Sequence, residues 1–230
     1  DHGGPSYSVP SLCTALNRAG AKTVLRTLAR GAPRVSTPPD FALDVHPTDA
    51  GLLGRWLAAS NALKRTLNGD AEAGATFHAH GLWLMPNIYP SWAKARSRGL
   101  AKLVHSPRGM LAANARRISG WKKAPFWLAL QRSALARADW LHATSEAEYE
   151  DLRALGLRNP VAVIPNAVEL PELAPRTQQG ARTLLYVGRL SPKKNLPALI
   201  RAWSTVAAEY PRWRLRIVGF DEAGHDATSF

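Results

Sequence analysis

Apolar stretches of strand length alternate along this chain with segments whose apolar residues recur at a helical period. Seven stretches are rich in β-forming residues, and they lie at 22–28, 75–80, 101–106, 139–144, 161–165, 182–188 and 214–219. Helix-period segments stand between several of them, at 6–19, 51–67, 122–138, 145–155 and 196–209. Strands that alternate with helices are typical of parallel sheets covered by helices. The expected fold class is therefore α/β.

Local signals sharpen two parts of this pattern. Ser145 is placed as the N-cap of the fourth helix, Glu148 completes a capping box, and Gly156 marks the helix end. The segment 31–50 contains four prolines, so we expect an irregular loop there.

A change of composition divides the chain. Three prolines and the polar run "RTQQG" interrupt the alternation within 165–182. We therefore expect one domain at 1–170 and the start of a second at 181–230. Only about fifty residues remain for the second domain, so it is expected to be incomplete and to leave an apolar sheet edge uncovered. The chain also starts with Asp1 at a glycine-rich loop with no strand before it, so we expect its start to be missing as well.

Composition places the chain among globular proteins, with 46% hydrophobic and 20% charged residues. Cys13 is the only cysteine, which excludes an internal disulfide and fits a reducing compartment. No apolar run is long enough to span a bilayer, and the first residues lack the features of a signal peptide. The expected location is the cytoplasm.

The net charge of +13 is unevenly distributed. Eleven Lys and Arg residues stand between Pro90 and Trp140 against one acid, Asp139, and tryptophans are interleaved with them. One interpretation is a solvated helical face with its tryptophans in the core. The other is a surface for polyanions such as anionic lipid, phosphorylated carriers or nucleic acid. Composition leaves both open.

Unusual residues fall at the predicted strand ends, where open parallel sheets bind ligands. Gly3 and Gly4 precede the first helix, where free backbone N–H groups can receive an anion, although a plain tight turn is the commoner explanation. "HAHGLW" ends the second strand, and at most one of its two histidines is expected to face the crevice. They make an unconvincing metal site because no further ligands stand at useful spacing. "HSPRGM" brings Arg108 to the end of the third strand.

"LLYVGRLSPKKNL" places Arg189 and Lys194 between a buried strand and the next helix. A guanidinium matches phosphate oxygens as a planar fork, and a lysine adds a mobile charge. Both heads are able to reach one diphosphate across five residues. A basic turn without a ligand is the alternative.

The order of these motifs resembles the retaining glycosyltransferases of family 4, over nearly the whole chain. The motifs that carry the resemblance are "GGPSYSVPSLCTALNRAG", "HAHGLW", "SPRGML", "LHATSEAEYEDLRALGLRNPVAVIPNAVELP" and "VGRLSPKKN". The resemblance implies two Rossmann-like domains in the arrangement called GT-B. It also implies that Arg189 and Lys194 act on the donor diphosphate as catalytic residues. The substrate-binding positions that it implies are Gly3, Gly4, His80, Arg108, Ser145 and Asn166.

Three departures from the family pattern stand out. Many members carry histidine in a "PHG" segment where this chain has Arg108, although the arginine form resembles a branch that acts on surface polysaccharides. Ala167 replaces the glycine of the family's "PNG" turn. The family's later segment, with two glutamates that contact sugar and ribose, is absent from the 230 residues, which stop at Phe230.

The resemblance implies transfer of a hexose from a nucleotide sugar to a glycan or lipid-linked acceptor, with retention of configuration. No metal and no cofactor are expected. An anionic membrane surface is an expected partner and places the protein at the inner face of the cell membrane, whereas no nucleic acid is expected. The alternative is a non-catalytic basic module that binds anionic membrane or nucleic acid. We expect the 230-residue chain alone to be inactive as a transferase.

Overall fold

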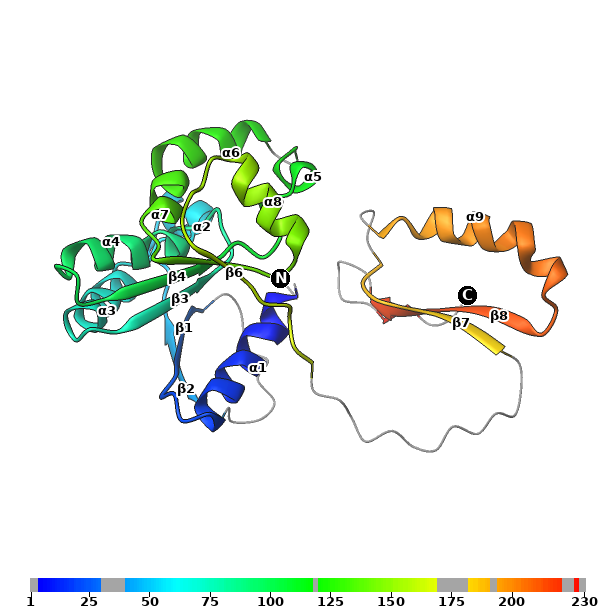
Figure 1. Cartoon of the computed structure of the whole chain (residues 1–230), viewed down its shortest axis with the longest axis horizontal. Helices are drawn as coiled ribbons and strands as arrows, with labels where there is room; N and C mark the ends of the chain where they lie inside the picture. Colours follow the sequence, from blue (N-terminus) through cyan, green and yellow to red (C-terminus); the bar gives the residue numbers. More distant parts are fainter. Residues whose placement is uncertain are drawn as a thin grey trace. The chain divides into compact units, whose positions relative to one another are not determined.

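The computed structural model describes residues 4–29, 40–117, 120–168, 182–190, 194–220 and 226–227. The chain forms two compact units, Asp1–Glu169 and Leu170–Phe230. Figure 1 shows that each unit has its own strands and helices, and each is described by itself. The predicted bounds of the two domains, 1–170 and 181–230, stay predictions.

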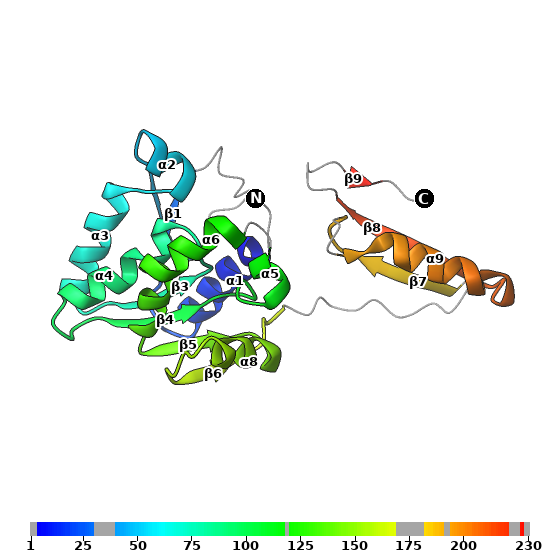
Figure 2. The same cartoon turned by 90° about the horizontal axis from the view of Figure 1, so that it is seen from above.

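The first unit is built on parallel strands. Its main sheet has the order β3-β4-β5-β6, and β1 and β2 form a separate parallel pair. Figures 1 and 2 show the main sheet among helices that lie on both of its sides. The strands are β1 (Val24–Leu28), β2 (Ala42–His46), β3 (Thr76–His80), β4 (Lys102–Ser106), β5 (Trp140–Ala143) and β6 (Val161–Val163).

Helices connect successive strands of the main sheet, as parallel pairing requires. One turn of 3₁₀-helix, η1 (Met85–Asn87), precedes α4, and a π-helical turn, η2 (Trp127–Gln131), joins α6 to α7. The α-helices are α1 (Pro5–Arg18), α2 (Leu52–Leu57), α3 (Asn61–Glu72), α4 (Tyr89–Arg96), α5 (Ala113–Arg117), α6 (Gly120–Phe126), α7 (Arg132–Ala136) and α8 (Glu146–Ala154). No helix of the described ranges is both long and apolar enough to cross a bilayer.

The core of this unit lies between the main sheet and its helices. Leu103 and Leu141 from adjacent strands are fully buried, and Leu135 of α7 and Leu152 of α8 pack in the same cluster. Cys13 is buried in α1, and burial raises the pKa of its thiol. The buried strands and amphipathic helices confirm the predicted α/β class.

Two charged contacts tie separate elements together. Arg26 of β1 reaches both carboxylate oxygens of Asp70 on α3, at 2.7 and 2.8 Å, and also contacts Asp44 on β2. Asp139, the single acid of the basic stretch, pairs with Lys94 of α4 at 2.8 Å and accepts the backbone N–H of Leu103 at 2.7 Å. Asp139 therefore joins α4, β4 and the start of β5.

The structure differs from the sequence prediction in two places before β3. The segment 31–50 contains β2, which pairs with β1 in parallel, so it is not wholly irregular. The helix predicted at 51–67 is two helices, because Ala58 takes a left-handed conformation with φ of 54° and Ser60 caps a new helix. Ser60 accepts the N–H of Leu63 at 3.2 Å, which is the N-cap contact that starts α3.

The second unit contains β7 (Arg182–Val187), α9 (Leu196–Val206), the 3₁₀ turn η4 (Ala207–Glu209), β8 (Trp213–Phe220) and β9 (Asp226–Ala227). β7 and β8 are parallel, and β9 pairs with β8 antiparallel. Leu185 and Val187 of β7 are 55% and 70% exposed. The apolar residues that the sequence predicted to be uncovered therefore lie on β7.

Candidate functional site

The carboxyl ends of β3, β4 and β5 bring three histidines together. His78 and His80 belong to β3, and His142 belongs to β5. The rings of His78 and His80 lie 4.1 Å apart, and His78 Nε2 lies 3.2 Å from His142 Nδ1. The two rings lie on the same face of β3, because residues two apart in a strand point to the same face, so the side chains do not point in opposite directions. The expectation that at most one of them faces the crevice stays a prediction.

The contacts of these rings define where their protons lie. His142 Nε2 lies 2.9 Å from the carbonyl of Ile164 and must donate to it, so His142 Nδ1 accepts from His78. His80 Nδ1 faces the guanidinium of Arg108, which only donates, so the proton of neutral His80 sits on Nε2. His105 is fully buried, and its Nε2 lies 3.0 Å from the carbonyl of Gly81.

Burial is the first cause of a lowered pKa at three histidines here, His78, His80 and His105. Burial, then the neighbouring His142 and Arg108, lower the pKa of His78 to about 4. Burial, then His78 and Arg108, lower the pKa of His80 to about 2. Burial also lowers the pKa of His105 to about 4 against the hydrogen bond to Gly81. His80 is therefore a neutral hydrogen-bond donor at physiological pH.

Arg108 stands at the end of β4 in a strained backbone conformation. Its φ is 57°, in the left-handed region that non-glycine residues seldom adopt, and Gly109 follows with a φ of 71°. Its Nε and Nη2 lie 3.3 and 3.1 Å from His80 Nδ1, and Nη1 donates to the side-chain oxygen of Asn166. Burial lowers the pKa of this guanidinium, and the charge of Glu148 opposes that effect. The structure thus brings together three of the predicted site residues, His80, Arg108 and Asn166.

Glu148 belongs to this arrangement, although its sequence pattern predicted only a capping role. Its carboxylate is buried at 3% exposure. Oε1 accepts the N–H of Gly109 at 2.6 Å, and Oε2 accepts the N–H and the hydroxyl of Thr144 at 2.7 and 2.8 Å. The N–H of Glu148 donates to the Ser145 hydroxyl oxygen at 3.2 Å, so the predicted N-cap is present. The second half of the predicted capping box is absent, because the carboxylate goes to Gly109 and Thr144.

Two further predicted residues of the first unit, Ser145 and Gly4, lie near the same edge. Ser145 is exposed, and its oxygen caps α8. Gly4 is the N-cap of α1 with a φ of −45°, and a Cβ there would have no atom within 4 Å. Figures 1 and 2 show that α1 begins on the side of the unit to which the strand ends point. Gly3 lies outside the described residues.

Backbone contact at the strand ends shapes the site of the second unit. A Cβ on Gly219 of β8 would lie 1.8 Å from the carbonyl oxygen of Gly188, so this position accepts only glycine without movement. The backbone carbonyl of Arg189 accepts from the Tyr186 hydroxyl at 3.1 Å, which fixes the chain just beyond β7. Lys194 is exposed and directly precedes Asn195, the left-handed N-cap of α9. Both predicted phosphate residues therefore stand between the end of β7 and the start of α9.

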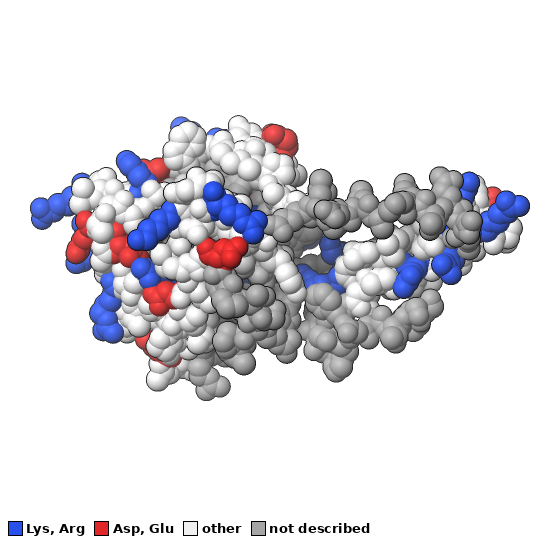
Figure 3. Space-filling model, turned by 90° about the horizontal axis from the view of Figure 1, so that it is seen from below, with Lys and Arg blue, Asp and Glu red and all other residues white. Residues whose placement is uncertain are grey.

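The tryptophans of the basic stretch divide into two groups. Trp92 and Trp127 pack on the core, whereas Trp121 and Trp140 are 78% and 52% exposed. Lys123 lies over the ring of Trp83, and both line a hollow of about 300 Å³ together with Arg116, Ala124, Trp127 and Leu128. On the face drawn in Figure 3 acidic and basic side chains are interspersed, so that face is not uniformly basic.

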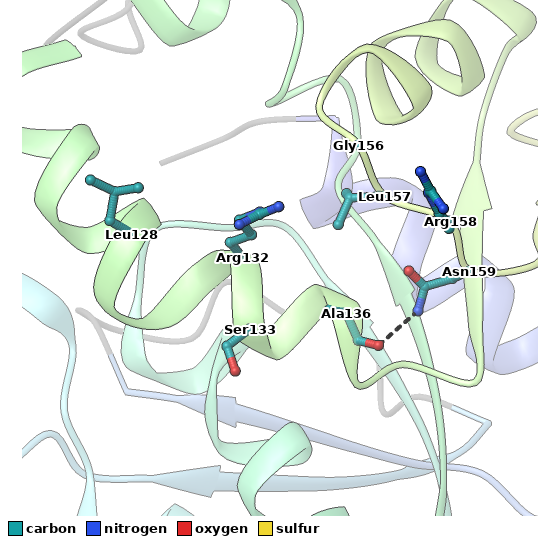
Figure 4. A pocket seen from close by; sticks show the side chains of 8 residues that line it. All are labelled: Leu128, Arg132, Ser133, Ala136, Gly156, Leu157, Arg158 and Asn159. Atoms are coloured by element: carbon teal, nitrogen blue, oxygen red, sulfur yellow. Dashed lines mark hydrogen bonds between the residues drawn. The ribbon is translucent and has the colours of Figure 1, made fainter.

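A larger groove of about 470 Å³ lies at the other edge of the main sheet, before β5 and β6. Figure 4 shows Arg132 on one side and Arg158 on the other, with Leu157 between them. Asn159 contributes its amide to the carbonyls that end α7, among them Ala136 at 3.1 Å. This groove is remote from the histidines in the topology, and its Asn159 completes the end of α7.

Among the residues described, no group of three or more His, Cys, Asp or Glu side chains is arranged to hold a metal ion. The histidine rings contact one another and Arg108, and the pairings above use Nε2 of His78, Nδ1 of His80 and both nitrogens of His142. The expectation of a reaction without metal or cofactor stays a prediction.

Comparison with known proteins identifies the family. Residues 3–167 match the family described as "Glycosyl transferase 4-like domain", and residues 174–229 match "Glycosyl transferases group 1". A protein named D-inositol 3-phosphate glycosyltransferase, from Kineococcus radiotolerans, is 30% identical over 248 residues, which cover 95% of this chain and 56% of that relative. The chain thus spans about half the length of this curated relative. The parallel sheets of both units are consistent with the Rossmann-like domains of GT-B glycosyltransferases. The chain belongs to the glycosyl transferase 4-like family.

Proposed function

We propose that the protein transfers a hexosyl group from a nucleotide sugar to a glycan or lipid-linked acceptor of a surface polysaccharide, with retention of configuration. The observation that carries this proposal is the position of Arg108, which His80 and Asn166 hold at the strand ends of a glycosyltransferase 4-like unit. Ligands of open parallel sheets bind at this edge. The alternative of a non-catalytic basic module receives no support from the comparisons.

Arg189 and Lys194 are the proposed donor-phosphate residues. A guanidinium and an ammonium next to the start of α9 offset the charge that grows on the leaving diphosphate as the glycosidic bond breaks. The donor phosphate itself then accepts the proton of the acceptor hydroxyl, so the proposal needs no metal. The match of residues 174–229 to group 1 glycosyltransferases supports this assignment.

Arg108 and His80 are the proposed acceptor-side residues, together with Gly3, Gly4, Ser145 and Asn166. Arg108 has two described hydrogen-bond partners, His80 and Asn166, and both are neutral. The nearby carboxylate of Glu148 acts on the charge of Arg108 but bonds to Gly109 and Thr144 instead, so the guanidinium has no carboxylate partner in the described ranges and is able to bind an anionic group of the acceptor. The relative from Kineococcus radiotolerans is named for a phosphorylated polyol, which has such a group. His80 Nε2–H is suited to donate to a sugar hydroxyl.

An anionic membrane is the proposed partner of the α5–α6 region, at the inner face of the cell membrane. Arg116 and Arg117 are exposed on α5, and Trp121 and Leu128 are 78% and 75% exposed nearby in the sequence. Cations attract anionic headgroups, and exposed apolar side chains suit the interface. Vesicles with and without anionic lipid test this. We expect the double variant Arg116→Gln, Arg117→Gln to weaken anionic-vesicle binding, and unchanged binding would reject the assignment.

The function is tested with the protein expressed from its complete gene. Purified protein is incubated with a panel of nucleotide sugars and with neutral or phosphorylated acceptors, in the presence of a chelator. We expect product from one donor, with the anomeric configuration of the donor retained in the product's NMR spectrum. Nucleotide release without a glycosylated product, or product with inverted configuration, would contradict the proposal.

A further inference from the structure

Glu148 has more hydrogen-bond partners than a helix cap requires. Ser145 already caps α8, so the carboxylate of Glu148 is not needed for that purpose. Its two oxygens instead accept from Gly109, after β4, and from Thr144, after β5. One buried carboxylate thus connects the ends of two adjacent strands with the first turn of a helix.

The Gly109 contact acts on the backbone directly after Arg108. Arg108 and Gly109 both have left-handed φ values, and an arginine keeps such a conformation only where its surroundings hold it. Two sets of contacts hold it here. His80 and Asn166 fix the guanidinium, and Glu148 fixes the following peptide.

The chemistry of the carboxylate fits this role better than that of an amide. A carboxylate accepts at both oxygens, and Glu148 faces donors on both sides, Gly109 on Oε1 and Thr144 on Oε2. A glutamine has one accepting oxygen, so it leaves one of these donors facing an NH₂ group. An unpaired buried donor is unfavourable, so the loop would move.

We infer that Glu148 is a positioning residue for Arg108: its buried carboxylate ties the loop after β4 to the end of β5 and thereby holds the Arg108 guanidinium on His80 and Asn166. The inference deepens the proposed function, because it names what aims the acceptor-side arginine. Its structural part does not depend on that function. The Glu148 oxygens are bonded to Gly109 and Thr144, so its role is to position Arg108.

The first test observes Arg108 directly in the 230-residue chain. The arginine Nε–Hε signals are recorded by NMR, and the Arg108 signal is assigned by its loss in Arg108→Lys. We expect Glu148→Gln to shift or broaden the Arg108 signal. Two matched controls on α8 should leave it in place: Glu150→Gln makes the same charge change at an exposed position, and Leu152→Ala removes buried packing without touching the loop.

An unchanged Arg108 signal in folded Glu148→Gln would overturn the inference, and so would an equal change in Leu152→Ala. If Glu148→Gln does not fold, Thr144→Val takes its place, since it removes only the hydroxyl donor to Oε2. A smaller change of the Arg108 signal is then expected, and an unchanged signal in Thr144→Val would overturn the inference.

The second test uses transfer by the complete gene product. Glu148→Gln should lower the rate on the order of tenfold in the wild-type background but less than about twofold when Arg108 is already lysine, because coupled residues are not additive. An equal fall in the transfer rate in the wild-type and the Arg108→Lys backgrounds would overturn the coupling between Glu148 and Arg108. Absence of transfer by the wild type would reject the proposed function alone, since the NMR result stands independently.

Discussion

The neutral histidines predict that the first unit is sensitive to mild acid. In the unfolded chain a histidine has a pKa of about 6.5, whereas His78, His80 and His105 have pKa values of about 4, 2 and 4 in the fold. Between these values the unfolded state binds more protons, so stability falls as the pH falls. The loss begins near pH 6.5 and continues to about pH 4, where His78 and His105 protonate in the fold.

The size of the effect follows from the number of protons taken up. Each histidine changes the free energy of unfolding by about 1.4 kcal/mol per pH unit once the unfolded chain is fully protonated. From pH 7 to pH 5 the three histidines together lower the free energy of unfolding by about 4–6 kcal/mol. The free energy of unfolding of a whole domain is roughly 5–15 kcal/mol, so we expect the first unit to approach unfolding near pH 5.

Urea unfolding, followed by tryptophan fluorescence at several pH values between 7 and 5, measures this slope. His105→Gln keeps a donor for the Gly81 carbonyl and removes one titrating ring, so the slope should fall by about one third. Leu103→Val is the control, because a buried methylene on the same strand is lost at every pH alike. The reasoning is refuted if stability is flat between pH 7 and pH 5, or if His105→Gln leaves the slope unchanged.

Three further predictions concern single positions. Arg108→Lys keeps the charge but loses the fork on His80, so acceptor use by the complete gene product should fall about tenfold; unchanged kinetics would remove Arg108 from the site. Gly4→Val should impair acceptor use without lowering the melting temperature, because a side chain there meets open space; a large loss of melting temperature would show a structural turn instead. Asp139→Asn should lower the free energy of unfolding at pH 7 by about 1–3 kcal/mol, measured in urea, because the pair with Lys94 is partly buried.

The destabilisation by Asp139→Asn depends on pH, and the pKa of Asp139 determines the sign of that dependence. Burial raises the pKa of Asp139, but the hydrogen bonds from Lys94 and the Leu103 N–H outweigh burial and lower it overall. Its stabilising contribution is therefore present above the ordinary carboxylate range and is lost as the pH falls through the lowered pKa. The wild type and Asp139→Asn should converge in stability at acid pH, and a constant difference would contradict this account.

Local sequence signals predicted most elements of the first unit because each buried strand is a short apolar run between turns. The strands at 76–80 and 102–106 lie inside the predicted stretches, and Ser145 caps α8 as its spacing indicated. β2 was missed because prolines surround it, although its apolar and polar residues alternate. The break at Ala58 was missed because the apolar period continues across it, and the N-cap Ser60 was the available signal.

The candidate site was harder to predict because its contacts join distant parts of the chain. Arg108 and Asn166 were singled out from separate motifs, but only the fold brings the two side chains together across 58 positions. Glu148 fits a local capping pattern, which hid its contact with Gly109, 39 positions away. The left-handed backbone of Arg108 has no sequence signal of its own beyond the glycine that follows it.

The donor-phosphate assignment is tested most directly by transfer rates of the complete gene product. The wild type is compared with Arg189→Ala, Lys194→Ala and the control Arg201→Ala, an exposed arginine on α9 of the same unit. Loss of a charge-assisted hydrogen bond of about 1.5–3 kcal/mol predicts a rate about ten- to a hundredfold lower in each of the first two variants. The control should match the wild type. Wild-type rates in both Arg189→Ala and Lys194→Ala would contradict the account.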